Sequence, residues 1–374
     1  MSPNTRPLVV LAAGGTGGHV FPAEALATTL LERGYRLALV TDRRGQSYGG
    51  TLGQLDTHRI AAGGVTGRGK LASLRALAEI GIGMLQARLL LARLKPAVVV
   101  GFGGYASVPT MVAASLRGIA TAIHEQNAVL GRANRLLAPR VRRVATSYAY
   151  VAHIDERLTA KVVHTGMPVR AAVAALRGTK YPSLGATDPL RLLVLGGSQG
   201  ARVLSEVIPA AIALLPESLR GRLEISQQCR PEDLDAVREA YGDANIAATL
   251  ESFFTDVPER MSAAHLVIAR SGASTVAELT ALGRPSILVP YPHATDDHQT
   301  ANAHAVDDVG AAWLMPQTAF TPEALATRLE SLFTQPGTLV RAAECASAAA
   351  RPDAASRLAD LVAELLGSTQ ESPS

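Results

Sequence analysis

The sequence predicts an α/β protein of two domains, each built on a parallel sheet. Short β-branched and other apolar runs alternate with helix-period stretches, a pattern typical of parallel strands joined by crossover helices. The series of strands starts again in the second half of the chain. A length of 374 residues is enough for two hydrophobic cores, since single domains usually contain about 100–200 residues.

The expected strands fall into two groups, one on each side of a Gly-, Pro- and Ser-rich stretch at 178–189 that is the best linker candidate. The first group is 8–13, 37–41, 97–102, 121–125, 143–147 and 162–165, and the second is 191–195, 223–227, 246–251, 266–269, 286–290 and 311–315. We therefore expect domains at 1–168 and 169–352, followed by a terminal helix at 353–366 with Asp353 as its cap and a frayed tail at 367–374.

Composition excludes several classes of protein. The two cysteines, Cys229 and Cys345, are too few for a disulfide framework or a zinc ribbon, which fits a reducing cytosol. The apolar run 8–13 is shorter than a signal-peptide core, and no run reaches the roughly 18 residues of a membrane-spanning helix. The net charge of +4 suits an anionic partner, but the scattered arginines form no nucleic-acid-binding stripe.

Three expected strands end in glycine-rich turns, at 14–18, 101–104 and 196–200. Glycine lets the backbone turn sharply and approach a ligand, and the helix from about Ala23 would add unpaired N–H groups. Because ligands bind at the carboxyl ends of parallel strands, we expect an anionic or polyhydroxyl ligand there. The alternative is that the glycines only permit tight turns. A dinucleotide oxidoreductase is disfavoured, because neither domain opens with the G-x-G-x-x-G pattern.

Three further polar segments follow expected strands. Residues 270–275 open a helix whose N–H groups, with Arg270, could neutralise a diphosphate, and Glu278 one turn later could bind ribose hydroxyls unless it is simply solvated. The run 124–127 (His-Glu-Gln-Asn) would be costly at a buried sheet edge unless its members meet a ligand or one another. The amides of 291–302 could bind sugar hydroxyls.

A metal alternative for the segment 291–302 rests on two histidines and two aspartates, namely His293, Asp296, Asp297 and His298. No further His or carboxylate at ligand spacing supports it, so we expect neither a metal nor another cofactor.

Together and in this order, the motifs resemble the MurG family, bacterial N-acetylglucosaminyltransferases that convert lipid I to lipid II. The resemblance runs from Gly14 to about Asn302 and implies the GT-B fold, two Rossmann-like domains facing across a cleft, with the last helix and tail (353–374) returning to the first domain. It implies UDP-N-acetylglucosamine as donor and undecaprenyl-pyrophosphoryl-MurNAc-pentapeptide as acceptor. It also implies a peripheral enzyme at the cytoplasmic face of the inner membrane, touching anionic lipid, with no nucleic acid.

The resemblance assigns site residues motif by motif. The second domain would hold the donor, and Thr16, Gly17, Gly18 and Asn127 of the first would complete that site after closure. The implied donor residues of the hinge and second domain are Arg170, Ser198, Phe254, Ala273, Ser274, Thr275, Val276, Ala277, Glu278, Gln299 and Asn302, and the implied acceptor residues are Gly103, Gly104 and Tyr105. Phe254 stands where an aliphatic residue is usual, and Thr300-Ala301 replaces bulkier residues.

Transfer with inversion needs a base for the acceptor hydroxyl. His19 is the leading candidate because histidine titrates near neutral pH, with orientation of the loop or of the acceptor diphosphate as its alternative role. Glu125 is a second catalytic candidate, and His124 is a weaker one.

A membrane-facing helix is expected at 74–94, which contains Arg75 and is preceded by Arg68 and Lys70, although a core helix would show the same apolar pattern. Two alternative functions stay open: a non-hydrolysing UDP-N-acetylglucosamine epimerase and a non-catalytic nucleotide-sugar-binding protein.

Overall fold

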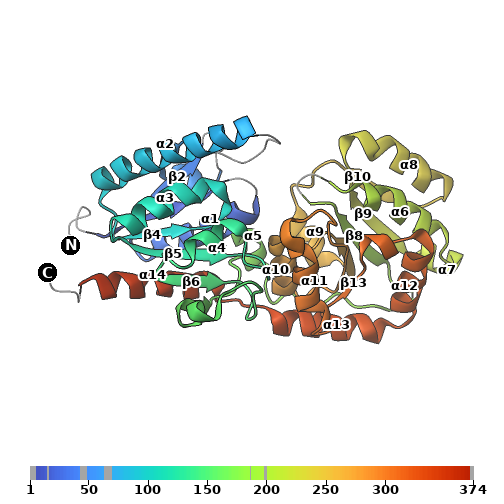
Figure 1. The fold of residues 1–374 in the computed structure, drawn as a ribbon. Helices are drawn as coiled ribbons and strands as arrows, with labels where there is room; N and C mark the ends of the chain where they lie inside the picture. Colours follow the sequence, from blue (N-terminus) through green and yellow to red (C-terminus); the bar gives the residue numbers. More distant parts are fainter. Residues whose placement is uncertain are drawn as a thin grey trace. The chain divides into compact units, whose positions relative to one another are not determined.

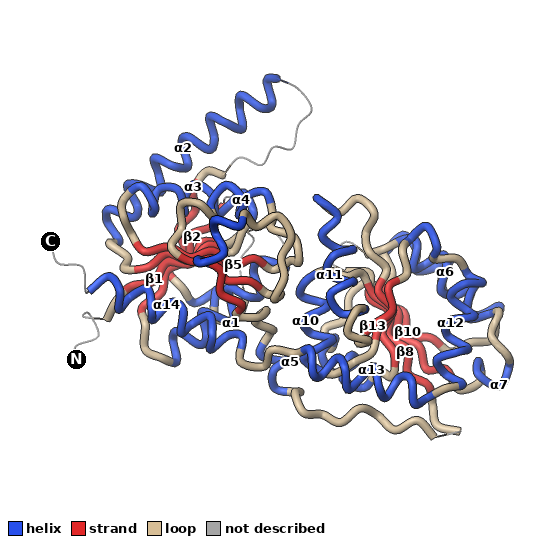
Figure 2. Tube along the Cα trace, turned by 60° about the horizontal axis from the view of Figure 1, so that its bottom comes forward, coloured by secondary structure: helices blue, strands red, loops and turns tan. Residues whose placement is uncertain are grey.

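The computed structural model describes residues 6–14, 17–42, 49–62, 70–185, 187–197 and 200–370. The chain forms two compact units (Figure 1): the first runs to Arg170 and resumes at Arg351, and the second comprises Ala171–Ala350. Each unit is a parallel sheet with helices on both faces (Figure 2). The units divide within two residues of the expected limits.

The first unit holds seven parallel strands in the order β3-β2-β1-β4-β5-β6-β7. They are β1 (Leu8–Ala12), β2 (Arg36–Asp42), β3 (Asp56–Ile60), β4 (Val98–Gly101), β5 (Ala120–Glu125), β6 (Arg143–Thr146) and β7 (Val162–His164). The helices of this unit are α1 (Gly17–Glu32), η2 (Leu52–Gln54), α2 (Lys70–Leu94), α3 (Gly104–Leu116), α4 (Arg132–Leu137), η3 (Glu156–Lys161) and α14 (Ala354–Gln370).

Strand β1 shows why the sheet is covered on both faces. Its side chains alternate, so Val9 and Leu11 join the cluster formed with α1 and α14, whereas Val10 and Ala12 join the cluster formed with α2 and α3. All four residues are fully buried. A near-continuous apolar run is what a parallel strand between two helix layers requires.

Helix α14 completes the first unit although it comes last in the chain. It packs against α1, and Arg33 and Asp360 form an ion pair of 2.6 Å between the two helices. A second pair joins Arg143 of β6 to Glu364, also at 2.6 Å. The helix continues to Gln370, so the tail expected from residue 367 begins as helix. In Figure 1 this helix lies beside the N-terminal elements.

The second unit holds six parallel strands in the order β10-β9-β8-β11-β12-β13. They are β8 (Leu190–Leu195), β9 (Leu223–Gln228), β10 (Ala248–Glu251), β11 (Leu266–Ala269), β12 (Ser286–Leu288) and β13 (Ala312–Leu314). Its helices are α5 (Ala171–Ala175), α6 (Arg202–Ala213), α7 (Glu217–Arg220), η4 (Pro231–Asp233), α8 (Leu234–Asp243), α9 (Val257–Ala263), α10 (Ala273–Leu282), η5 (Thr295–Asp297), α11 (His298–Asp307), η6 (Gln317–Ala319), α12 (Pro322–Thr334) and α13 (Pro336–Ala349).

The predicted α/β class is confirmed, and every expected strand has a counterpart. The expected linker stretch belongs to the second unit as the connection from α5 to β8. Strand β3 was not expected, because in its sequence Asp-Thr-His-Arg-Ile only Ile60 is fully buried. Among the described residues, no helix combines the length and the apolar character needed to cross a bilayer.

Candidate functional site

The strand order of each sheet reverses at one point, between β1 and β4 in the first unit and between β8 and β11 in the second. The carboxyl ends of strands beside such a switch point form the crevice where ligands bind in open α/β sheets. Glycine-rich turns follow β1, β4 and β8. The predicted glycine turns therefore lie at the two switch points.

His19 lies over the glycine pair that follows β4. Helix α1 begins at Gly17, earlier than expected, so Gly17, Gly18 and His19 form its first turn. Gly103 and Gly104 have φ values of 84° and 70°, which favour glycine. A Cβ on Gly103 would lie 3.4 Å from His19 Cε1, and one on Gly104 would lie 3.6 Å from His19 Nε2.

A chain of hydrogen bonds connects His19 to the interior of the first unit. His19 Nδ1 lies 3.0 Å from Gln126 Oε1. Gln126 Nε2 donates to the Phe102 carbonyl at 3.0 Å and contacts His124 Nδ1 at 3.1 Å. His124 Nε2 lies 3.2 Å from the Gly166 carbonyl. Burial lowers the pKa of His124 to about 4, so this imidazole is neutral at physiological pH.

The Glu125 carboxylate holds the loop that follows β5. It accepts hydrogen bonds from the Asn127 amide at 3.0 Å, the Gly131 amide at 2.9 Å and Asn134 Nδ2 at 2.8 Å. The side chain is buried, so these donors satisfy a charge that would otherwise be costly. All four residues of the polar run 124–127 thus meet protein groups, Asn127 through the Glu125 carboxylate.

Two more predicted residues of the first unit can be placed. The Arg170 guanidinium lies 5.0 Å from the centre of the Phe21 ring of α1, a cation–π contact. Tyr105, in the first turn of α3, is 42% exposed. Thr16 and Ser198 lie outside the described residues.

Helix α10 presents its N-terminus at the end of β11. Gly272 caps it, so the amides of Ala273, Ser274 and Thr275 are those that a helix leaves without intrahelical partners. Within the described part of the chain, the buried Ser274 Oγ has no hydrogen-bond partner. Glu278 is 5% exposed, which removes the alternative of a solvated helix residue.

Arg270 donates hydrogen bonds to protein groups of the second unit. Its Nη1 donates to the carbonyls of Val289 and Pro290 at 3.1 and 2.9 Å, and its Nη2 donates to Gln317 Oε1 at 2.8 Å. Its guanidinium also lies 5.6 Å from the Tyr291 ring. Arg270 therefore braces the segment after β12.

The residues predicted to bind the sugar, Gln299 and Asn302, lie next to the start of α10. Asn302 is fully buried, and its Nδ2 donates to the Ser271 carbonyl at 3.1 Å. Ser271 Oγ donates to the Gln299 carbonyl at 2.8 Å, and Gln299 Oε1 accepts from the Tyr291 amide at 2.9 Å. These bonds fix the start of α11 against the turn before α10.

Phe254, whose backbone is assigned to uracil, is only 4% exposed. Its ring lies 4.4 Å from the Arg260 guanidinium. The larger side chain therefore packs into protein.

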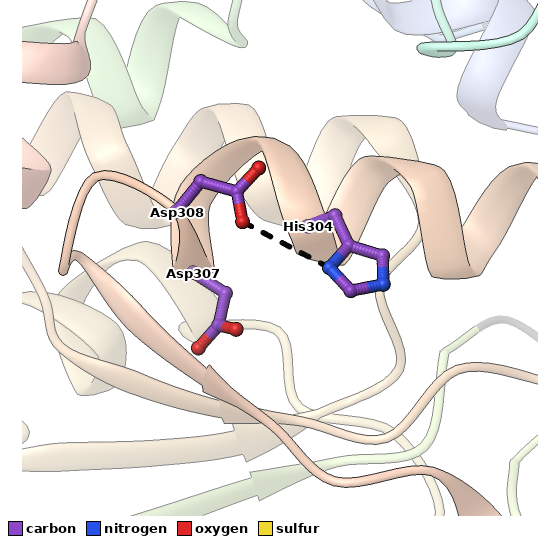
Figure 3. A group of neighbouring side chains, drawn as sticks. All are labelled: His304, Asp307 and Asp308. Carbon is purple, nitrogen blue, oxygen red and sulfur yellow. Dashed lines mark ion pairs between the residues drawn. The ribbon is translucent and has the colours of Figure 1, made fainter.

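One group in the described part of the chain has the residue types and spacing of a metal site: His304, Asp307 and Asp308 (Figure 3). His304 Nδ1 lies 4.0 Å from Asp308 Oδ1, and both side chains are more than half exposed. Asp307 Oδ1 already accepts from the Leu314 amide at 3.2 Å, which ties α11 to β13. The residues of the predicted metal alternative at 293–298 are not part of this group.

The sequence reasoning missed three contributors to the first site. Gln126 contacts both His19 and His124, Asn134 binds Glu125, and Phe21 lies under Arg170. Gln126 belongs to the polar run 124–127 that the sequence marks as a site. Its hydrogen-bond partner Phe102 is identified only by the structure, in which β4 and β5 are adjacent strands.

Comparison with known proteins places both units in one family. Residues 9–146 match the glycosyltransferase family 28 N-terminal domain, and residues 191–358 match the C-terminal domain of the same family. A curated relative from Paramagnetospirillum magneticum is 68% identical over 361 residues, covering 96% of this chain and 97% of the relative. One from Rhodospirillum rubrum is 61% identical, covering 95% and 91%. Both are named UDP-N-acetylglucosamine–N-acetylmuramyl-(pentapeptide) pyrophosphoryl-undecaprenol N-acetylglucosamine transferase.

Solved structures agree with this placement. MurG of Acinetobacter baumannii superposes with a TM-score of 0.78 at 32% identity, covering 96% of this chain and 99% of that one. A UDP-N-acetylglucosamine 2-epimerase has a TM-score of 0.66 at 12% identity, covering 99% and 98%, which shows a shared fold alone. The chain therefore belongs to glycosyltransferase family 28 and, within it, to the MurG group with its two-domain GT-B fold.

Proposed function

We propose that this chain is an inverting glycosyltransferase that moves N-acetylglucosamine from UDP-N-acetylglucosamine to the C4 hydroxyl of the MurNAc-pentapeptide of undecaprenyl-linked lipid I. The product is lipid II, the precursor for peptidoglycan synthesis. The observation that carries this proposal is the 68% identity, over 96% of the chain, to a relative named for this transfer.

The second unit is assigned the donor. The amides of Ala273, Ser274 and Thr275 stabilise the negative charge that develops on the leaving UDP, together with the positive end of the α10 dipole. The buried carboxylate of Glu278 binds the ribose hydroxyls, and the backbone at Phe254 binds uracil. Gln299 and Asn302 bind the sugar. Gln299 does so through its side-chain amide nitrogen, because its side-chain oxygen accepts a hydrogen bond from the Tyr291 backbone amide. Ser198, Val276 and Ala277 complete this assignment.

The first unit is assigned the acceptor and the proton. Gly103, Gly104 and Tyr105 contact the acceptor, and His19 takes the proton of its C4 hydroxyl. Glu125 acts by positioning Asn127, because the donors of the 127–134 loop occupy its carboxylate oxygens. Thr16, Gly17, Gly18 and Arg170 are assigned to the nucleotide sugar.

Radiolabelled UDP-N-acetylglucosamine incubated with lipid I tests the proposal directly. We expect label in a lipid-extractable disaccharide product, with one UDP released for each product formed. Formation of a C2-epimeric sugar nucleotide without lipid product would identify an epimerase instead. Tight UDP binding without turnover would identify a nucleotide-sugar-binding protein.

We further propose that α2 docks on anionic lipid at the cytoplasmic face of the inner membrane. Ile82, Leu85 and Leu89 are 53%, 60% and 64% exposed, and their spacing puts them on one face of the helix. Arg88 is exposed between them, as expected for an interfacial helix. Figure 1 shows α2 on the outside of its unit.

The opposite face of α2 is firmly attached to the first unit. A Cβ on Gly83 would lie 1.8 Å from the Ala61 carbonyl oxygen, so only glycine permits this approach. Gln86 Oε1 accepts from the Ala61 amide at 2.8 Å, and Ala87 and Leu91 are buried. The exposed apolar face is therefore presented on a fixed helix. Of the basic residues expected beside it, Lys70 and Arg75 lie on α2 and Arg68 lies outside the described residues.

A double substitution, Leu85→Glu with Leu89→Glu, is expected to weaken binding to anionic vesicles by at least about tenfold. The reason is that two apolar contacts are replaced by charges that anionic lipid repels. Cosedimentation with phosphatidylethanolamine–phosphatidylglycerol vesicles measures this. Leu214→Glu is the matched control, because Leu214 is 56% exposed on the second unit. Equal binding by the double variant and this control would reject α2 as the docking face.

A further inference from the structure

We propose that Gln126 is a positioning residue that holds His19 in the tautomer protonated at Nδ1, which leaves Nε2 as the proton acceptor of the transfer. This inference rests on the proposed base role of His19. The Gln126 amide contacts the His19 imidazole, and which of the neighbouring atoms can donate and which can only accept determines where the hydrogens lie.

The orientation of the Gln126 amide is fixed by its buried end. Gln126 Nε2 lies 3.0 Å from the carbonyl oxygens of both Phe102 and His124. A carbonyl oxygen can only accept, so the NH2 group of the amide must face these two atoms. The side chain is 2% exposed, and a reversed amide would place its oxygen against two buried oxygens.

The tautomer of His19 follows from that orientation. With the NH2 group turned inward, the atom 3.0 Å from His19 Nδ1 is Oε1, which can only accept. His19 Nδ1 must therefore carry the hydrogen. A neutral imidazole has one N–H, so Nε2 keeps its lone pair.

His124 supports the same arrangement from the other side. Its Nε2 lies 3.2 Å from the Gly166 carbonyl and donates to it, which leaves Nδ1 as an acceptor facing Gln126 Nε2 at 3.1 Å. Because burial lowers the pKa of His124 to about 4, this ring does not become a competing donor near neutral pH. The two hydrogens of Gln126 Nε2 thus face three acceptors, namely the carbonyls of Phe102 and His124 and His124 Nδ1, so one hydrogen is shared and both ring tautomers stay compatible with this amide.

The hydrogen bond from His19 Nδ1 to Gln126 also suits a base that becomes positively charged when it takes up a proton during the reaction. The hydrogen of the acceptor hydroxyl moves to Nε2 as the hydroxyl oxygen bonds to the anomeric carbon, while the bond from that carbon to the diphosphate breaks and its electron pair leaves with UDP. His19 then carries two N–H groups, and the hydrogen bond from Nδ1 to Gln126 is kept and strengthened by the charge. Gly104 leaves space at Nε2, since even a Cβ there would lie 3.6 Å away.

The tautomer can be observed by NMR in the full-length protein with ¹⁵N-labelled histidine. The chain has nine histidines, and the His19 signals are identified by their loss in His19→Gln. Above neutral pH we expect a protonated Nδ1 and an unprotonated Nε2 for His19. In Gln126→Met, which keeps length but cannot hydrogen-bond, we expect the hydrogen to move wholly or partly to Nε2. Gln227→Met, another buried glutamine but in the second unit, should leave the His19 signals unchanged.

Kinetics separate this inference from the base role itself. We expect kcat of Gln126→Met to fall by about 10–100-fold with KM for UDP-N-acetylglucosamine changed less than about threefold. A wild-type His19 protonated at Nε2, or unchanged His19 signals in Gln126→Met, overturns the inference even if that variant is inactive. A shifted tautomer with unchanged kcat overturns the base role of His19 and, with it, the catalytic part of the inference. If Gln126→Met does not fold, the wild-type spectrum still decides the tautomer.

Discussion

Replacing His19 with Ala is expected to lower kcat for lipid II formation by about 10²–10⁴-fold at saturating substrates. This is the usual contribution of a positioned general base, and the attack of a sugar hydroxyl depends on removal of its proton. The ring lies half-buried in the first turn of α1, beside the glycine pair 103–104 and bonded to Gln126. Because the ring is only partly buried, we expect the variant to fold.

The measurement needs both kinetic constants, because the other role considered for His19 predicts a different result. If His19 only orients the acceptor diphosphate, KM for lipid I rises while kcat stays near the wild-type value. His304→Ala is the matched control, since His304 is an exposed histidine of the second unit. An unchanged kcat at saturating substrates would contradict the base role.

Much of the fold could be predicted because each strand is marked by its own sequence. Buried parallel strands are apolar on both faces, so β1, β4 and β11 appear as short continuous apolar runs. Edge strand β3 lacks this mark, since Asp56 and Arg59 are exposed. The start of α1 was missed for a related reason, because two glycines and Pro22 in its first turns give no helical propensity signal.

The site was only partly predictable, because its polar contacts join residues that are distant in sequence. The polar run 124–127 predicted a site, but the sequence does not indicate that Gln126 hydrogen-bonds to the Phe102 carbonyl or that Glu125 accepts a hydrogen bond from Asn134. Arg270 shows the same limit. An arginine before a helix N-terminus suggests an anion, but nothing in the sequence indicates that this guanidinium also donates to the carbonyls that follow β12. The sequence identifies the polar side chains, whereas the order of the strands determines which of these side chains are in contact.

The largest stability effect is expected from Arg284→Met, which should destabilise the second unit by about 3–5 kcal/mol. Arg284 is 1% exposed, and its described hydrogen bonds all go to backbone carbonyls. Its Nη2 donates to Ser262 at 2.6 Å and its Nη1 to Leu282 at 2.7 Å, so the guanidinium joins the end of α9 to the end of α10. Met fills a similar volume but leaves these buried oxygens without donors.

Fluorescence of Trp313, the single tryptophan of the chain, follows this transition selectively because it lies on β13 in the second unit. We expect the urea midpoint of that signal to fall in Arg284→Met. Arg238 is an exposed arginine on α8, so Arg238→Met should change the free energy of unfolding by less than about 0.5 kcal/mol. Since the amides that we propose to bind the UDP diphosphate lie at the other end of α10, loosening its C-terminus should also weaken UDP binding below the unfolding midpoint. A variant that unfolds like the control would mean that water replaces the lost donors. A destabilised variant with unchanged UDP affinity would mean that the N-terminus of α10 is held independently, by the bonds that tie Ser271 to Gln299 and Asn302.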